Sequence, residues 1–145
     1  MKNSSCVVML IVLCTLSVPS LSATCDDVSG TWRNALGSTL TVNKIEKGVM
    51  SGSFQLSPKI DSFQYTVVGV VNTKAKSEER SNVTAVSFSV HWDFLGSVGN
   101  WVGVCRGSKS NSKLELIGHQ VVPNAGQVNE HVYTHQDVFY PSTAS

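Results

Sequence analysis

The stretch Val86-Ser87-Phe88-Ser89-Val90-His91-Trp92-Asp93-Phe94 alternates apolar and polar side chains at every step. Successive side chains of a β-strand point to opposite faces, so this alternation predicts a strand with one apolar and one polar face. The rest of the chain lacks the 3.6-residue periodicity that is typical of amphipathic helices. The sequence therefore favours an all-β fold.

Seven further runs rich in Val, Thr, Ser and Phe are separated by Gly, Asn, Ser and Lys. With the first stretch they give eight expected strands: Val28–Asn34, Ser38–Asn43, Val49–Leu56, Phe63–Asn72, Thr84–Phe94, Asn100–Arg106, Lys113–Val122 and His131–Tyr140. An open sheet of consecutive strands leaves two unpaired edges, and closure into a barrel removes both. We therefore expect an eight-stranded antiparallel up-and-down β-barrel, which side chains can fill or which can hold one small ligand.

The first 22 residues differ from the rest of the chain. A positive start at Met1–Lys2 is followed by an apolar run, Cys6–Leu16, and by small residues in Pro19–Ser22. This order is typical of a secretory signal peptide that is removed, and the run is shorter than the roughly 20 residues that span a bilayer. A signal anchor is the alternative. Removal leaves residues 23–145, a single domain by size.

Two of the four cysteines leave with the signal peptide, so Cys25 and Cys105 remain. In an oxidising compartment, an even pair in a small domain indicates one disulfide. Closing a loop of about 80 residues would contribute on the order of 4 kcal/mol to stability.

The Asn82-Val83-Thr84 triplet is a glycosylation acceptor beside a polar stretch. Both a glycosylated and an unmodified Asn82 remain open.

The charge balance excludes two classes of partner. The chain has 11 Lys and Arg against 10 Asp and Glu, and Lys2 leaves with the signal peptide. Electrostatic binding to nucleic acid requires a basic excess, and so does a polybasic membrane anchor. We therefore expect neither a nucleic acid nor a membrane as partner.

The residues also argue against catalysis and metal binding. There is no G-x-S-x-G nucleophile elbow and no glycine-rich phosphate loop, and the adjacent acids fall in expected loops. On one strand, His131 and His135 would lie about 13 Å apart, too far to share a metal ion. We expect no enzyme and no metal site, and interpret His119, His131 and His135 as surface or barrel-lining residues.

Aromatic residues and a few polar residues fall on or beside the expected strands. The aromatic ones are Trp32, Phe54, Trp92, Phe94 and Trp101, and the polar ones are Asn34, Ser38, Ser97 and Asp137. Aromatic walls with a few placed polar groups are typical of small-ligand pockets, although the tryptophans could also be plain core.

Several motifs resemble those of the avidin and streptavidin family. Gly30–Ser38 (GTWRNALGS) resembles the G-x-W-x-N-x-L-G-S run that opens these proteins, and Gly48–Phe54 resembles their next segment. The later matches are Trp92-Asp93-Phe94, then Ser97, Trp101, Gly103 and Cys105 at matching spacing, and the D-x-F of Asp137 and Phe139. The resemblance covers nearly all of the chain after the signal peptide, is specific in its first motif and is weak after Cys105.

The resemblance implies a barrel that binds biotin at one end, usually as a homotetramer, with the cysteines paired as in the animal members. Asn34 and Ser38 would donate to the ureido oxygen of biotin, and Asp137 would accept from a ureido nitrogen. The aromatic residues Trp92, Phe94 and Trp101 would pack against the thiophene ring and the tail, with Ser97 near the tail. Fixed dipoles and apolar walls suit a polarised ureido group in a dry site.

Departures from the family pattern predict a weaker affinity. Phe54 and Leu56 stand where the family has hydroxyl groups, and His119 stands where it has a tryptophan. Each lost hydrogen bond costs about 1–3 kcal/mol, and a 5 kcal/mol deficit is between three and four decades in Kd. The stretch Gly126–Val132 lacks the aromatic residue that one subunit lends to its neighbour, so a dimer competes with the tetramer.

The sequence thus predicts a secreted biotin-sequestering protein with no other cofactor. Two alternatives remain open. One is a structural or oligomerisation module that keeps the barrel and has lost the ligand. The other is a lipocalin-like carrier of a different small apolar ligand, because a G-x-W near the first strand also occurs in that class of barrel.

Overall fold

A computed structural model describes residues 23–60, 62–72, 83–93, 96–108, 111–123, 126 and 131–142. Three sequence predictions lie outside these residues: the signal peptide of residues 1–22, the glycosylation site Asn82 and the aromatic residue Phe94. Among the described residues, no helix has the length and apolar character that crossing a membrane requires.

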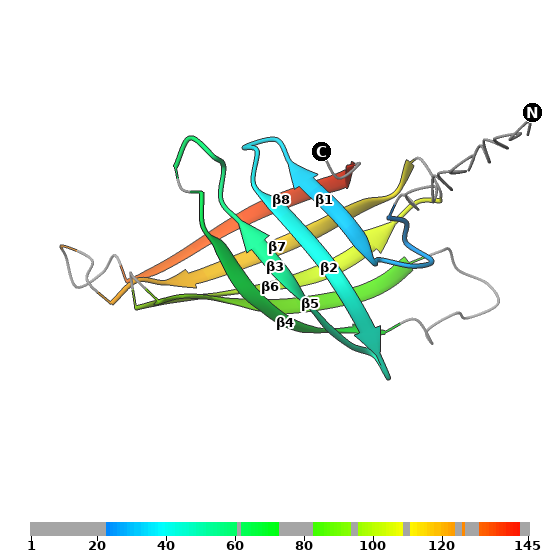
Figure 1. Cartoon of the computed structure of the whole chain (residues 1–145), viewed down its shortest axis with the longest axis horizontal. Helices are drawn as coiled ribbons and strands as arrows, with labels where there is room; N and C mark the ends of the chain where they lie inside the picture. Colours follow the sequence, from blue (N-terminus) through cyan, green and yellow to red (C-terminus); the bar gives the residue numbers. More distant parts are fainter. Residues whose placement is uncertain are drawn as a thin grey trace, which may run out of the picture.

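The chain forms one closed antiparallel barrel (Figure 1). Its strands are β1 (Gly30–Asn34), β2 (Thr39–Glu46), β3 (Val49–Gln55), β4 (Gln64–Asn72), β5 (Val83–Trp92), β6 (Ser97–Arg106), β7 (Lys113–Val121) and β8 (Val132–Ser142). Each strand pairs with the next, and β8 pairs with β1, where Thr31 lies opposite Ser142. The predicted eight-stranded up-and-down barrel is confirmed.

Several strands extend beyond their predicted limits, and β6 and β2 do so by three residues each. β6 begins at Ser97, which was expected in a loop, and Ser97 pairs with Trp92 of β5. β2 continues to Glu46 before a two-residue turn, in which Lys47 has φ 51° and Gly48 has φ 83°. Such positive φ values belong to tight hairpin turns, whose twist matches that of the strands. A lysine at the first turn position gives little sequence signal for this turn.

The inside of the barrel follows the predicted alternation. In β5 the residues Thr84, Val86, Phe88, Val90 and Trp92 are buried, while their neighbours face outward. Aromatic and aliphatic side chains of all eight strands meet in one continuous core. The core therefore fills most of the barrel, and any ligand must enter at an end.

One end of the barrel is closed by the segment before β1. Ala23, Cys25 and Val28 are buried there, and Cys25 forms the predicted disulfide with Cys105. The Trp32 Nε1–H donates to the Val28 carbonyl at 2.8 Å, and the Thr84 hydroxyl donates to the Cys25 carbonyl at 2.8 Å. These contacts leave the opposite end as the place for a ligand.

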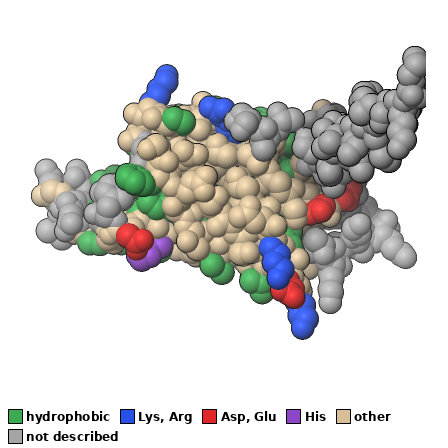
Figure 2. All heavy atoms as spheres, viewed as in Figure 1, with side chains coloured by type: hydrophobic (Ala, Val, Ile, Leu, Met, Phe, Trp, Pro, Cys, Tyr) green, Lys and Arg blue, Asp and Glu red, His purple; other side chains and the backbone are tan. Residues whose placement is uncertain are grey.

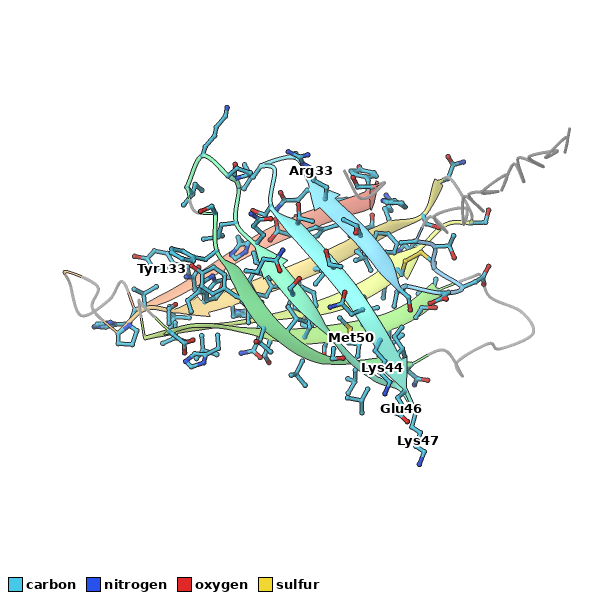
Figure 3. All side chains as sticks on the ribbon, viewed as in Figure 1. Arg33, Lys44, Glu46, Lys47, Met50 and Tyr133 are labelled. Carbon is cyan, nitrogen blue, oxygen red and sulfur yellow. A yellow bond between two sulfur atoms is a disulfide. The ribbon has the colours of Figure 1, made fainter. Side chains whose placement is uncertain are left out.

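One face of the barrel, which β1 to β3 present, carries few charged side chains (Figure 2). Figure 3 places Lys44, Glu46 and Lys47 at the protruding β2–β3 hairpin. On β7, the Lys113 ammonium lies 2.7 Å from Glu115. This hydrogen bond lowers the pKa of the Glu115 carboxyl below its ordinary value and raises the pKa of Lys113.

Candidate ligand-binding site

A cavity of about 130 Å³ opens at the end of the barrel opposite the disulfide. Seven of its lining residues were predicted as ligand contacts: Asn34, Ser38, Phe54, Leu56, Trp92, Trp101 and Asp137. Four others were not: Leu36, Ile60, Gln120 and His135. The strands β1, β3, β5, β6, β7 and β8 thus bring together residues that lie up to 103 positions apart.

Two larger hollows lie outside the barrel. One of about 310 Å³ lies over β6 to β8, next to Val102, Ile117 and Val138, and another of about 400 Å³ lies at the β2–β3 hairpin. Neither combines an aromatic wall with converging polar groups. The cavity inside the barrel does, so it is the candidate site.

Asp137 is the polar centre of the cavity, and its side chain is 10% exposed. The Asn34 Nδ2–H donates to its Oδ1 at 3.0 Å. The Trp101 Nε1–H donates to its Oδ2 at 2.9 Å, and His135 Nε2 lies 3.1 Å from the same oxygen. An ionised carboxylate offers about four acceptor positions, so about one, on Oδ1, remains for a ligand donor.

Asn34 is held on both sides. It ends β1, and its Oδ1 accepts the Ser38 backbone N–H at 2.8 Å across the turn between β1 and β2. Gly37, at φ 89°, allows the chain to turn there, and its N–H donates to the Asn34 carbonyl. Because a backbone N–H only donates and a carboxylate only accepts, these two partners fix the orientation of the amide. One N–H of Asn34 is therefore available next to Asp137.

Aromatic rings form the wall and floor of the cavity. Trp101 lies between Phe88, stacked at 5.2 Å and 11°, and Phe54, stacked at 5.4 Å and 27°. Trp92 meets Phe54 edge-on at 6.2 Å. Among the described residues, Trp92 Nε1 is the buried side-chain nitrogen that has no hydrogen-bond partner. The rings hold one another in place, which fixes the shape of the wall.

Ser97 lies behind the cavity rather than in it. Its side chain is fully buried, and its hydroxyl donates to the Val121 carbonyl at 2.7 Å. It accepts a hydrogen bond from Gln120 Nε2 at 3.2 Å. Gln120 does line the cavity, so Ser97 contributes by holding that amide.

The sequence analysis expected the side chain of His119 to face the ligand site, and this placement is wrong. His119 is exposed on the outer face of β7, with Nδ1 3.0 Å from Thr134 Oγ1. The inward positions of this part of β7 are Gly118 and Gln120. A shift of one residue along a strand moves a side chain to the other face, so Gln120 takes the inward place that was expected for His119.

His135 is a cavity residue that the sequence analysis left as a surface or barrel-lining histidine. It precedes Asp137 by two residues on β8, which puts both side chains on one face of the strand. That spacing was a usable signal for its place in the cavity.

The third predicted histidine, His131, lies outside the cavity lining, and its Nδ1–H donates to the Val122 carbonyl. In the described segments, no three His, Cys, Asp or Glu side chains come together as a metal site would require.

Comparisons with known proteins agree with this architecture. The Avidin family matches residues 22–142 of the chain. Avidin-related protein 2 of Gallus gallus is 27% identical over 113 residues, which cover 77% of this chain and 73% of the relative. Avidin-related protein 4/5 of Gallus gallus is 27% identical over 104 residues, which cover 71% of this chain and 67% of the relative.

Proposed function

Because this chain belongs to the avidin family, we propose that it is a secreted protein that binds biotin in the cavity of its barrel and carries out no catalysis. The family assignment also removes the reason for the lipocalin alternative, since the G-x-W run belongs to the avidin pattern here. What the chain would sequester is then the bicyclic urea of biotin, with no metal or further cofactor.

The pairing of Asn34 with Asp137 carries this proposal. An amide donor and a carboxylate acceptor lie 3.0 Å apart beside a wall of stacked aromatic rings. A cyclic urea presents a carbonyl oxygen next to N–H groups, so it can accept from Asn34 while it donates to Asp137. Ser38 lies beside them on the cavity wall and offers a second donor to the ureido oxygen. The aromatic wall would supply apolar burial for the sulfur-containing ring.

Three features favour a weaker affinity than that of the tightest biotin complexes. Phe54 and Leu56 line the cavity without a hydroxyl group. Most of the acceptor positions of Asp137 are already filled by protein donors. The cavity of about 130 Å³ is also small beside the ~300–1,000 Å³ of most ligand pockets. We therefore expect the rings of biotin to enter and its tail to lie at the rim, near Leu36 and Ile60.

Secretion and self-association complete the proposal. The Cys25–Cys105 disulfide suits an oxidising compartment, which agrees with the signal peptide expected in residues 1–22 and with carbohydrate at Asn82 if that site is used. The hollow over β6 to β8 is bordered by the exposed side chains of Val102, Ile117 and Val138. Contiguous exposed apolar surface marks protein interfaces, so we expect a homodimer or homotetramer.

A second candidate function follows from the size of the cavity. A barrel whose interior Phe54 and Leu56 largely fill would serve as an oligomerisation module without biotin binding. Both candidates use the same outer surface, so the oligomeric state does not separate them, whereas ligand binding does.

Calorimetric titration of biotin into the protein without residues 1–22 tests the proposal. We expect saturable binding with one site per subunit, and its loss in Asp137→Ala. Thermal unfolding of that variant distinguishes a lost contact from a lost fold. Absence of binding at millimolar biotin by the intact protein would reject the proposed function and favour the oligomerisation module.

A further inference from the structure

His135 is built into the cavity and is not a chance surface residue. Its Nε2 lies 3.1 Å from Asp137 Oδ2, and its ring stands edge-on to Trp101 at 5.8 Å and 76°. Its side chain remains 39% exposed, and it lines the cavity. It can therefore exchange protons with solvent while it contacts the group expected to receive the ligand.

Gly118 makes this contact possible. It is paired with Trp101 on one side and with His135 on the other, at the centre of three neighbouring strands. A Cβ atom at Gly118 would lie 2.7 Å from Trp101 Nε1 and 2.6 Å from His135 Nε2. Both ring nitrogens thus use the space above a residue without a side chain, and both reach the same oxygen of Asp137.

This arrangement makes His135 a competitor for Asp137. A ligand N–H must use the remaining acceptor position on Oδ1 or displace the imidazole from Oδ2. A protonated imidazole forms a charge-assisted hydrogen bond, roughly twice as strong as a neutral one, and it also offsets the negative charge that attracts the ligand donor. Protonation should therefore weaken the hold of Asp137 on a ligand.

We propose that His135 is a specificity-determining residue of the cavity, which competes with the ligand N–H for Asp137 and makes biotin binding tighter at neutral than at acidic pH. Histidine changes its charge between about pH 5 and pH 8, which includes the range from blood plasma to acidic vesicles. This inference rests on the proposed function and adds to it the regulation of the same site.

The surroundings of His135 leave few other groups to titrate in this range. The elements beside it contribute Trp101 and Gly118, which carry no titratable group, and Asp137 is its partner on β8. Tyr133, two residues earlier on β8, is exposed. Among the described residues that line the cavity, His135 and Asp137 are the two ionisable ones.

The test is calorimetric titration of biotin at pH 8 and at pH 5. We expect a Kd about tenfold higher at pH 5 for the intact protein. His135→Gln keeps a side-chain N–H near Asp137 but cannot become charged, so its Kd should be the same at both pH values. His119→Gln is the matched control, because this histidine lies one strand away on the outer face, and it should keep the full pH dependence.

A second measurement needs no variant. If biotin prefers the neutral imidazole, its binding near pH 6 must release protons, by the reciprocity of linked equilibria. Binding heats in two buffers of different ionisation enthalpy report that release. Equal Kd values at pH 5 and pH 8, or pH dependence that persists in His135→Gln, would overturn this inference alone. Absence of biotin binding at both pH values would overturn the proposed function and this inference with it.

Discussion

Among single residues, Asn34 shows most clearly how the site is held together. Its amide joins two elements, since it accepts from Ser38 in the first turn and donates to Asp137 in β8. Both bonds are buried, and buried polar groups that lose a partner cost about 1–3 kcal/mol. The same side chain therefore supports the fold and presents its remaining N–H to a ligand.

We predict that Asn34→Asp is unstable at neutral pH and recovers in acid. The substitution places two carboxyl groups about 3 Å apart, and like charges raise the pKa of one of them in the folded state. A raised folded-state pKa means stability that is present at low pH and is lost as the pH rises through that value. The measurement is Tm at pH 4 and pH 7. Asn34→Ala, which loses the same bonds without adding charge, should show a similar deficit at both pH values, and an equal deficit in Asn34→Asp would contradict the prediction.

Phe54 offers a gain-of-function test. In the related motif this position carries a hydroxyl that donates to the ureido oxygen, and Phe54 lines the cavity while stacked on Trp101. Phe54→Tyr should tighten biotin binding roughly tenfold, which corresponds to one hydrogen bond. The Kd of the variant is compared with that of the parent by titration at pH 8. Unchanged or weaker binding would show that position 54 does not face the urea.

Different sequence signals pointed to the polar residues of the candidate site. Asn34 and Ser38 came from a nearly complete motif in the first hairpin, and Asp137 came from a two-residue match in the last strand. His135 lacked a motif and was left as a surface or barrel-lining histidine, although its two-residue spacing from Asp137 could have placed it in the cavity. The hydrogen bond of Trp101 to Asp137 joins β6 to β8, and no local pattern specifies such a contact.

At the scale of strands, β5 and β7 show when alternation is informative. β5 puts apolar side chains inward and mostly small or polar ones outward, so the pattern fixed its register. The second half of β7 does the reverse, because Ile117 and Val121 face outward while Gly118 and Gln120 face inward. Such a strand gives little hydrophobic signal for its register. His119 was placed inward only by its resemblance to the family tryptophan, and the register differs by one residue, so Gln120 takes that place.

In β7, Gly118 is a position where an added side chain would disturb the packing. We predict that Gly118→Ala lowers stability by about 1–3 kcal/mol, as overpacking does, because the methyl group meets the ring nitrogens of Trp101 and His135. Biotin affinity should fall as well, since the two groups that contact Asp137 Oδ2, Trp101 and His135, must move. Chemical denaturation and titration measure the two effects. Gly126→Ala is the control, because a Cβ there meets no atom of the described residues within 4 Å. A Gly118→Ala protein as stable as this control would argue against the packing described here.

For the whole molecule, the disulfide and the segment around it close one end of the barrel. Cys25 and Cys105 are separated by 80 positions, so reduction frees a long loop in the unfolded chain. We predict that Cys25→Ser with Cys105→Ser costs on the order of 4 kcal/mol, measured by urea denaturation. Biotin binding at the opposite end should survive wherever the barrel stays folded. Unaltered stability would mean that the packing of the buried Ala23 and Val28 side chains holds this end without the disulfide.

The outer surface sets the assembly of the whole molecule. Ile117 lies at the hollow over β6 to β8 and is exposed in the single chain. We predict that Ile117→Lys reduces the number of subunits, because burying a lysine in an apolar interface is costly. Size-exclusion chromatography with light scattering gives the mass. Ser51→Lys on the exposed outer face of β3 should leave it unchanged, and an unaltered mass for Ile117→Lys would place the interface elsewhere.

The sandwich of Trp101 between Phe88 and Phe54 gives the protein an optical property of its own. The indole nitrogen of Trp101 bonds the carboxylate that a guest would approach, whereas Trp32 is buried and bonded to Val28 near the closed end. Indole fluorescence responds to the local electric field and to quenching by neighbours. Ultraviolet emission from Trp101 should thus report occupancy of the site in real time, without a dye or a label.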